Sequence, residues 1–149
     1  MEGKEIKILI FDLNNEYYAT DILDVERIIG YEKPTEMPDV PNFVEGVINL
    51  DNRILPVINL AKKFKFPDFE VGDLSKIIVI KKNENRFGIV VDNVYEVKDV
   101  DYDLFEEAPH VTTTISKKFV KGLIKLEGKI VILLNMIDIL SEEEEGMIY

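Results

Sequence analysis

An internal repeat is the feature that most constrains how this chain can fold. The stretch beginning at Phe43 reads FVEGVINLDNRILPVINL, and the stretch beginning at Phe119 reads FVKGLIKLEGKIVILLNM. The two align without a gap and share apolar residues, a glycine and an asparagine at equivalent places. A chain of 149 residues is long enough for one ordinary domain or two very small ones. The repeat therefore predicts two units of the same architecture.

The repeat extends upstream of this segment. Tyr18-Ala19 is equivalent to Phe87-Gly88, but the spacing shows that the second copy has a longer middle loop. The two middle loops, YEKPTEMPDVPN and VDYDLFEEAPHVTTTISKK, are rich in proline and polar residues and are predicted to be irregular. The repeat units therefore run from about residue 6 to 62 and from about 76 to 140.

Each unit is predicted to consist of short strands joined by tight turns. The apolar runs are short, rich in Ile, Val, Tyr and Phe, and separated by Asn-containing turns, which is typical of β-hairpins. Asp51-Asn52 and Glu127-Gly128 lie where a two-residue hairpin turn needs positive φ. About five such strands bury one face only by curling into a small barrel. We therefore expect a mainly β fold with two five-stranded barrels.

The repeat leaves open how the barrels are assembled. Each barrel could form from one contiguous half, or the halves could exchange hairpins, because both arrangements produce the same repeat. We expect residues 1–149 to form a single domain. After the second unit, the spacing from Met136 predicts a short C-terminal helix that frays, and the acidic run Glu142–Glu145 is interpreted as a solvated end.

Charge and composition exclude several classes of partner and site. The chain has 29 acidic and 18 basic residues, a net charge of −11, so a nucleic-acid backbone or an anionic membrane surface would on average repel it. It has no cysteine, which excludes disulfides and thiolate sites. The apolar run from Ile8 to Phe11 is too short for a secretion signal or a membrane span. We expect a cytoplasmic protein with basic partner surfaces, no nucleic acid and no direct membrane contact.

Motifs for catalysis or metal binding are scarce. The one histidine, His110, has no cysteine or Ser-His-Asp spacing beside it and is interpreted as an ordinary loop residue. Asp99, Asp101 and Asp103 resemble the start of a calcium loop, but Leu104 stands where glycine is required. No glycine-rich phosphate-binding motif occurs. We therefore expect no metal, no cofactor and no enzymatic activity, the remaining catalytic alternative being an unfamiliar carboxylate site.

The apolar density of the segment from Ile22 to Ile29 exceeds what one buried face needs. One interpretation places Ile22, Val25 and Ile29 in a barrel core, because apolar residues of short strands usually lie there. The other interpretation places some of them in a groove between the barrels, where a protein partner binds. With so little catalytic equipment, a protein-binding module is the favoured class.

The repeated segment and its flanks resemble the CheW family of chemotaxis coupling proteins. The similarity is carried by YYATDILDVERIIGYEKPTEMPDVPNFVEGVINLDNRILPVINL, by RFGIVVDNVYEV and by FVKGLIKL, and it extends from about Ile6 to about Leu140. The resemblance implies two SH3-like five-stranded β-barrel subdomains, possibly intertwined. It also implies a non-catalytic adaptor, monomeric on its own, that joins chemoreceptor tips to the regulatory domain of the histidine kinase CheA in receptor arrays at the inner membrane. The alternative is a CheW-like module of a different two-component signalling assembly.

The resemblance also assigns candidate partner surfaces. In the family, the helical hairpin tip of the receptor docks along a groove between the subdomains, and one barrel end meets a barrel of the kinase. The receptor-groove candidates in this chain are Ile22, Val25, Arg27, Ile28, Val44, Gly46 and Asp51. The kinase-contact candidates are Ile78, Val90 and Val91 in the second unit.

One departure from the family pattern leads to a specific hypothesis. The family signature usually continues N-L-R-G, whereas this chain reads NLDN, with Asp51 in place of the arginine. Family members often carry an acidic residue where this chain has Arg27. The two positions are therefore predicted to have exchanged charges and kept an ion pair of opposite polarity. The alternative is two unrelated surface charges that contribute roughly 0 to 1 kcal/mol at most.

Overall fold

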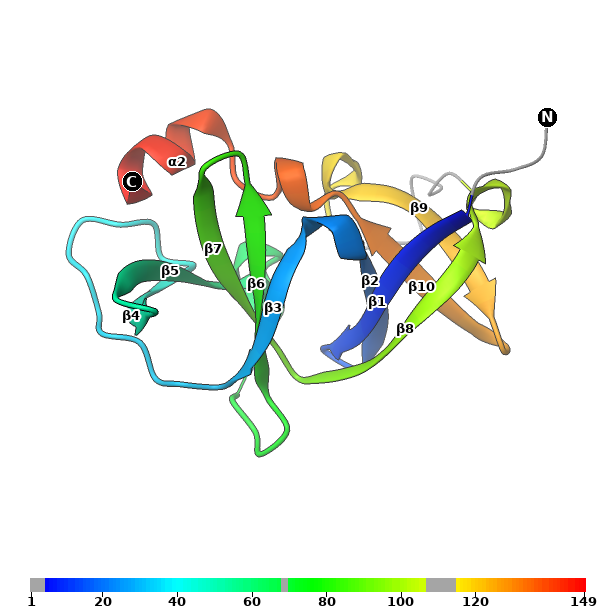
Figure 1. Cartoon of the computed structure of the whole chain (residues 1–149), viewed down its shortest axis with the longest axis horizontal. Coiled ribbons are helices and arrows are strands. Elements are labelled where there is room, and N and C mark those ends of the chain that lie inside the picture. Colours follow the sequence, from blue (N-terminus) through cyan, green and yellow to red (C-terminus); the bar gives the residue numbers. More distant parts are fainter. Residues whose placement is uncertain (1–4, 68–69, 107–114) are drawn as a thin grey trace.

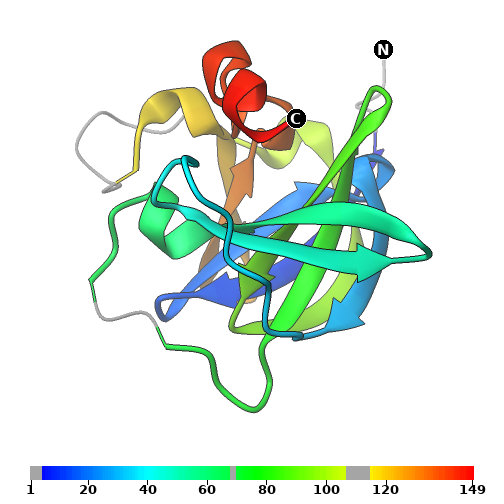
Figure 2. The same cartoon turned by 90° about the vertical axis from the view of Figure 1, so that its left-hand side faces the viewer.

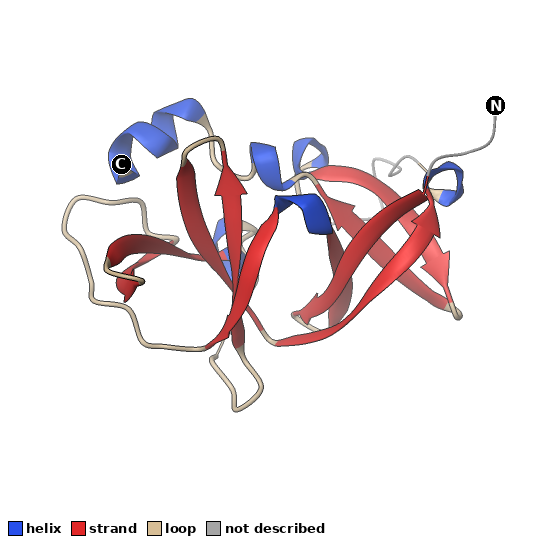
Figure 3. Ribbon diagram, in the orientation of Figure 1, coloured by secondary structure: helices blue, strands red, loops and turns tan. Residues whose placement is uncertain are grey.

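A computed structural model describes residues 5–67, 70–106 and 115–149 and shows two curled five-stranded sheets lying side by side (Figure 1). Sheet A contains, in spatial order, β8 (Asn93–Asp101), β1 (Glu5–Leu13), β2 (Glu16–Asp21), β10 (Lys129–Leu134) and β9 (Val120–Leu126). Sheet B contains β3 (Val25–Gly30), β6 (Lys76–Lys82), β7 (Asn85–Val91), β5 (Arg53–Asn59) and β4 (Val44–Leu50). The predicted mainly β fold is confirmed, and Figure 3 shows that helices are short and few beside the strands.

Each sheet takes strands from both repeat units. The β1–β2 hairpin of the first unit lies between β8 and β10 of the second unit, and β2 pairs with β10 in parallel. In the same way, the β6–β7 hairpin of the second unit lies between β3 and β5 of the first, and β5 pairs with β7 in parallel. The two units therefore exchange their leading hairpins, which is one of the two arrangements that the repeat allows.

The two copies of the repeat share their turns and their close backbone contacts. Both predicted hairpin turns have positive φ at both central residues, 54° and 64° at Asp51-Asn52 and 51° and 80° at Glu127-Gly128. Gly46 has a φ of 139°, and a Cβ built there would lie 2.0 Å from the carbonyl oxygen of Thr35. This contact accompanies a bridge between Thr35 and β4, so the chain after β3 reaches the opposite edge of its own sheet. Glycine is needed at position 46 because the backbone passes so closely there and φ is positive.

The apolar residues form three clusters, one within each sheet and one between the sheets. On β6, Ile77 and Val79 pack into the core of sheet B, whereas Ile78 and Ile80 pack into the cluster that joins the two sheets. Successive residues of a strand point to opposite faces, so a strand that is buried on both faces needs a continuous apolar run. This requirement explains why the sequence is denser in apolar residues than one barrel core would require.

Within the described residues, short helical elements connect or end the strands. They are η1 (Ile22–Asp24), α1 (Leu60–Lys63), η2 (Tyr102–Leu104), η3 (Lys117–Phe119) and η4 (Met136–Asp138). The predicted C-terminal helix is present as α2 (Glu142–Ile148), but it begins at the acidic run and not at Met136. Ser141 caps it in a capping box with Glu144, and carboxylates are favourable at the positive N-terminal end of a helix.

The interpretation of Glu142–Glu145 as a solvated end is wrong for two of its residues. Lys63 Nζ donates to Glu144, and Lys82 Nζ lies 2.7 Å from Glu145 Oε1, so α2 is held against α1 and the β6–β7 hairpin. The hydroxyl of Tyr149 adds a hydrogen bond of 2.7 Å to the carbonyl oxygen of Arg86. Figure 2 shows α2 at the same end of the molecule as the turn of the β6–β7 hairpin. The sequence pattern missed these contacts because their partners lie far away along the chain.

Candidate functional site

The two edges of sheet B meet at an ion pair. Arg27 Nη2, on edge strand β3, donates to Asp51 Oδ2 in the β4–β5 turn at the opposite edge of the sheet. The two side chains are 41% and 59% exposed. The ion pair between Arg27 and Asp51 that the sequence suggested is therefore formed in the structure. We call this meeting of β3 with the β4–β5 turn seam B.

A β-bulge places a second carboxylate in seam B. The pairing of β3 with β6 shifts between Val25 and Arg27, which leaves Glu26 as an extra residue. Its carboxylate accepts a hydrogen bond of 2.8 Å from Arg86 Nη1 on β7 and lies 3.6 Å from Arg27 Nε. Arg86 is only 9% exposed, and its Nη2 is buried without a hydrogen-bond partner among the described residues. A buried guanidinium needs such a carboxylate, because an unpaired buried charge is costly.

The predicted receptor-groove residues divide into exposed and framework positions. Arg27, Ile28 and Asp51 are exposed, and two of them form the seam B ion pair. Ile22 and Val25 are partly buried and pack against the cluster between the sheets. The other two candidates, Val44 and Gly46, are buried and shape the backbone rather than present side chains.

The three kinase-contact candidates lie in the interior. Ile78, Val90 and Val91 are 0–1% exposed, on the two inner strands β6 and β7 of sheet B. Ile78 and Val91 pack between the sheets, and Val90 packs inside sheet B. Side chains in these places cannot form a contact surface, because inner strands here are covered on both faces. A kinase contact has to use other side chains.

Sequence reasoning missed several strongly exposed apolar residues. Leu23 in η1 is 87% exposed, and Ile54, directly after the β4–β5 turn and Arg53, is 74% exposed. Its equivalent in the second copy, Ile130, is 63% exposed. An apolar residue in a short strand is normally assigned to the core, so neither isoleucine taken alone indicates that its side chain is exposed. The available signal was the recurrence of isoleucine at the second position after both turns, where strand residues face solvent.

The equivalent place in sheet A has a similar construction. Lys98 Nζ, on edge strand β8, lies 2.9 Å from Glu127 in the β9–β10 turn and 3.7 Å from Glu96. The hydrogen bond to Glu127 raises the pKa of Lys98, and the same bond lowers the pKa of Glu127. We call this place seam A. In both sheets, a turn carboxylate thus pairs with a cation on the facing edge strand.

The remaining candidates for chemistry have structural roles where they are described. Asp99 pairs with Lys7 at 3.0 Å, and Asp101 caps η2 by accepting from the amide of Asp103. His110 lies outside the described residues. No group of three or more acidic or histidine side chains in residues 5–67, 70–106 and 115–149 is arranged to hold a metal ion. None of the helices in those ranges is long and apolar enough to cross a membrane.

Comparison with known proteins agrees with this architecture. The chain is 34% identical over 142 residues to the chemotaxis protein CheW of Klebsiella aerogenes, covering 95% of this chain and 86% of that protein. It is 33% identical over 132 residues to the chemotaxis protein CheW of Bacillus subtilis, covering 89% and 83%. The crystal structure of the scaffolding protein TtCheW from Thermoanaerobacter tengcongensis matches with a TM-score of 0.86 at 34% identity, covering 95% of this chain and 91% of that one. The profile of the CheW-like domain matches residues 7–144, so the chain belongs to the CheW family.

Proposed function

We propose that this protein is a chemotaxis scaffold that couples chemoreceptors to the histidine kinase CheA and has no catalytic activity of its own. The observation that carries the proposal is the family match over residues 7–144 together with the shared fold of a protein described as a scaffold. The structure supports a binding role, since its exposed features are ion-paired seams flanked by apolar side chains.

The receptor tip is proposed to dock along η1 and β3. This surface offers the exposed Leu23 and Ile28 as apolar anchors, with Arg27 and Asp51 at its charged rim. Ile22 and Val25 support it from below, because both pack against the cluster between the sheets. A few apolar anchors that lose their water usually dominate such an interface, so we expect Leu23 and Ile28 to contribute most of the receptor affinity.

The kinase contact is proposed to use the exposed end of sheet B at Ile54. The resemblance assigns to the kinase a contact between barrel ends, and the three residues first considered for it are buried. Ile54 is a large, exposed apolar side chain beside the turn of seam B. In this arrangement the protein is monomeric alone and lies with its partners at the cytoplasmic side of the receptor arrays.

An NMR titration of the isotope-labelled chain tests the proposal. A receptor tip fragment and the CheA regulatory domain are added in separate experiments, and amide shifts are followed in η1, β3 and the β4–β5 turn. Saturable shifts with each partner, at Leu23 and Ile28 for the receptor and at Ile54 for the kinase, are expected. Absence of shifts with both partners refutes the adaptor function. Shifts with a kinase domain but none with the receptor tip fragment favour the alternative, a module of a different two-component signalling assembly.

A further inference from the structure

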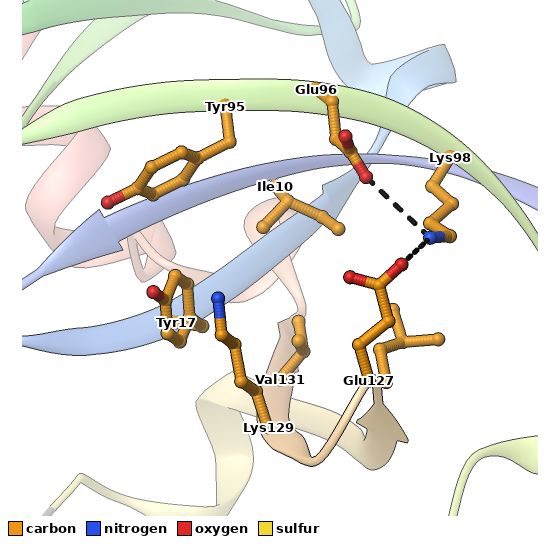
Figure 4. Close-up of a pocket in the computed structure, with 9 residues that line it drawn as sticks. Ile10, Tyr17, Tyr95, Glu96, Lys98, Glu127, Lys129 and Val131 are labelled. Carbon is orange, nitrogen blue, oxygen red and sulfur yellow. Dashed lines mark hydrogen bonds and ion pairs between the residues drawn. The ribbon is translucent and has the colours of Figure 1, made fainter.

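Seam A contains a small cavity. The cavity has a volume of about 140 Å³ and lies between the rings of Tyr17 and Tyr95 on one side and the Lys98–Glu127 ion pair on the other (Figure 4). The two ring centroids are 5.6 Å apart, and Ile10 lies between these two sides. The volume is well below the roughly 300 to 1,000 Å³ of pockets for small ligands or cofactors, so it suits the end of one side chain.

The repeat shows what fills the same place in sheet B. In the repeat alignment, Tyr17 is equivalent to Arg86, and Tyr95 is equivalent to Glu26. Tyr95 is also the extra residue of a bulge in β8, as Glu26 is in β3. In seam B these positions hold a buried guanidinium and its carboxylate partner. In seam A two aromatic rings stand at these positions, and both line the cavity.

The second guanidinium of seam B is also absent from seam A. Arg27, which pairs with the turn carboxylate Asp51, is equivalent to Glu96. Glu96 and the turn carboxylate Glu127 have side chains that are 58% and 74% exposed, and both lie near the single ammonium of Lys98. Two accessible carboxylates therefore face a cavity in the position where the other copy of the fold holds arginine.

The charge and the ring faces of seam A favour a cation. The hydroxyl of Tyr95 donates to Asp12 over 2.7 Å, and the other oxygen of that carboxylate is buried with no hydrogen-bond partner in the described part of the chain. On the far side of the cavity, the carboxylates of Glu96 and Glu127 share the single ammonium of Lys98. Lys129 Nζ already lies 4.7 Å from the Tyr17 ring centroid, which shows that a cation is accepted on an aromatic face here. Tyr95 is 48% exposed and leaves its ring available.

We propose that seam A is a binding site for a single arginine side chain of a basic partner protein. The guanidinium stacks on Tyr95 and pairs with Glu96 and Glu127, taking the place that Arg27 and Arg86 occupy in seam B. Its planar fork matches a carboxylate better than a lysine ammonium does, and it stacks on aromatic faces. The net charge of −11 draws basic partners toward the site. This inference does not depend on the adaptor function.

The test uses capped tripeptides and NMR on the full chain. Acetyl-Gly-Arg-Gly-amide is titrated beside the same peptide with citrulline, which is neutral and nearly the same shape, and with norleucine, which is apolar. The arginine peptide is expected to give saturable shifts at Tyr95, Lys98 and Glu127 and to bind about tenfold more tightly than the citrulline peptide. Glu127→Gln and Glu96→Gln are each expected to weaken binding about fivefold. The matched control, Asp51→Asn in seam B, leaves binding unchanged.

Three results would overturn the inference. Equal binding of the citrulline or norleucine peptide would show that the cavity selects shape or apolar surface and not charge. Equal loss of affinity in Asp51→Asn and Glu127→Gln would show general attraction to an acidic chain. Absence of saturable shifts in seam A, in a chain whose spectrum shows it folded, would show that the cavity does not accept arginine.

Discussion

Arg27 and Asp51, separated by 24 residues of the first repeat unit, form an ion pair that joins the two edges of sheet B. The pair has the reverse polarity of the one that the CheW resemblance implies for these positions. Reversal preserves the contact while it changes which charge each edge shows to a partner. Seam B therefore joins the two edges of the sheet and also determines which charge each edge presents to a partner.

Exchanging the two charges tests the stability contribution of this pair. Arg27→Ala and Asp51→Ala are expected to show a coupling of about 0.5 kcal/mol in urea unfolding, because both side chains are partly solvated. The double swap Arg27→Asp with Asp51→Arg restores stability to within that amount. A coupling indistinguishable from zero would show that the two side chains are independent surface charges.

Removing the partner of the buried guanidinium should cost more. Glu26→Gln leaves Arg86 buried without a carboxylate, and we expect the free energy of unfolding to fall by about 2 kcal/mol. The estimate lies below that for a fully buried pair because the Glu26 side chain is 26% exposed. Glu96→Gln, on an exposed carboxylate of seam A, serves as the control and is expected to change stability by less than about 0.5 kcal/mol. Similar losses for both variants would contradict the role of Glu26.

Aspartate substitutions on β3 separate docking from folding. Ile28→Asp places a charge on an exposed position, so receptor affinity should fall roughly tenfold or more while the unfolding free energy changes by less than about 1 kcal/mol. Val25→Asp also removes packing against the cluster between the sheets, and we expect it to weaken receptor binding and to cost about 2 kcal/mol of stability. Affinity and stability are measured by calorimetric titration and urea unfolding. Unchanged affinity in Ile28→Asp would remove β3 from the receptor surface.

Acidification is expected to loosen the C-terminal helix. Burial alone would raise the pKa of Glu144, but the hydrogen bonds from Lys63 and Ser141 outweigh it and leave the pKa below its usual 4.5. A carboxylate with a lowered folded-state pKa stabilises the fold above its unfolded pKa, and this stability is lost as the pH falls below 4.5 through the lowered value.

The variant Glu144→Gln isolates this contribution. It keeps a capping-box side chain but removes the charge, so we expect about 1 kcal/mol lower stability at pH 7 and a weaker pH dependence below 4.5. Thermal unfolding across this pH range provides the measurement. Glu143→Gln, on an exposed neighbour in the same turn, is the control. An equal pH dependence in wild type and Glu144→Gln would assign the acid sensitivity to other groups.

Glycine is expected to be indispensable at only one of two compared positions. Gly46→Ala forces a Cβ to within 2.0 Å of the Thr35 carbonyl oxygen at a φ of 139°, and we expect a loss of about 3 kcal/mol or more. Gly30→Ala meets nothing within 4 Å and should change stability by less than about 1 kcal/mol. Circular dichroism melting compares the two variants. A Gly46→Ala protein as stable as Gly30→Ala would mean that the loop after β3 moves away without cost.

Some elements of the candidate site could be read from the sequence and others could not. The Arg27–Asp51 pair was predicted because two departures from one family pattern pointed to the same contact. Glu26 and Arg86 were missed because their pairing depends on a bulge and on the exchanged β6–β7 hairpin, neither of which has a local signal. Ile78 was assigned to a surface because one apolar residue in a strand does not reveal that both faces of that strand are covered.

The sequence by itself determined the two repeat units, their strands, and the turns at Asp51-Asn52 and Glu127-Gly128, because period-2 patterns and positive φ are local properties of a few residues. Only the tertiary structure decided which hairpin belongs to which sheet, where the edges meet, and which of two equivalent seams is filled. Those outcomes depend on contacts between distant segments. Because the two units have the same local pattern, a hairpin can pair with strands of its own unit or with those of the other unit. The packing of the whole chain decides between the two.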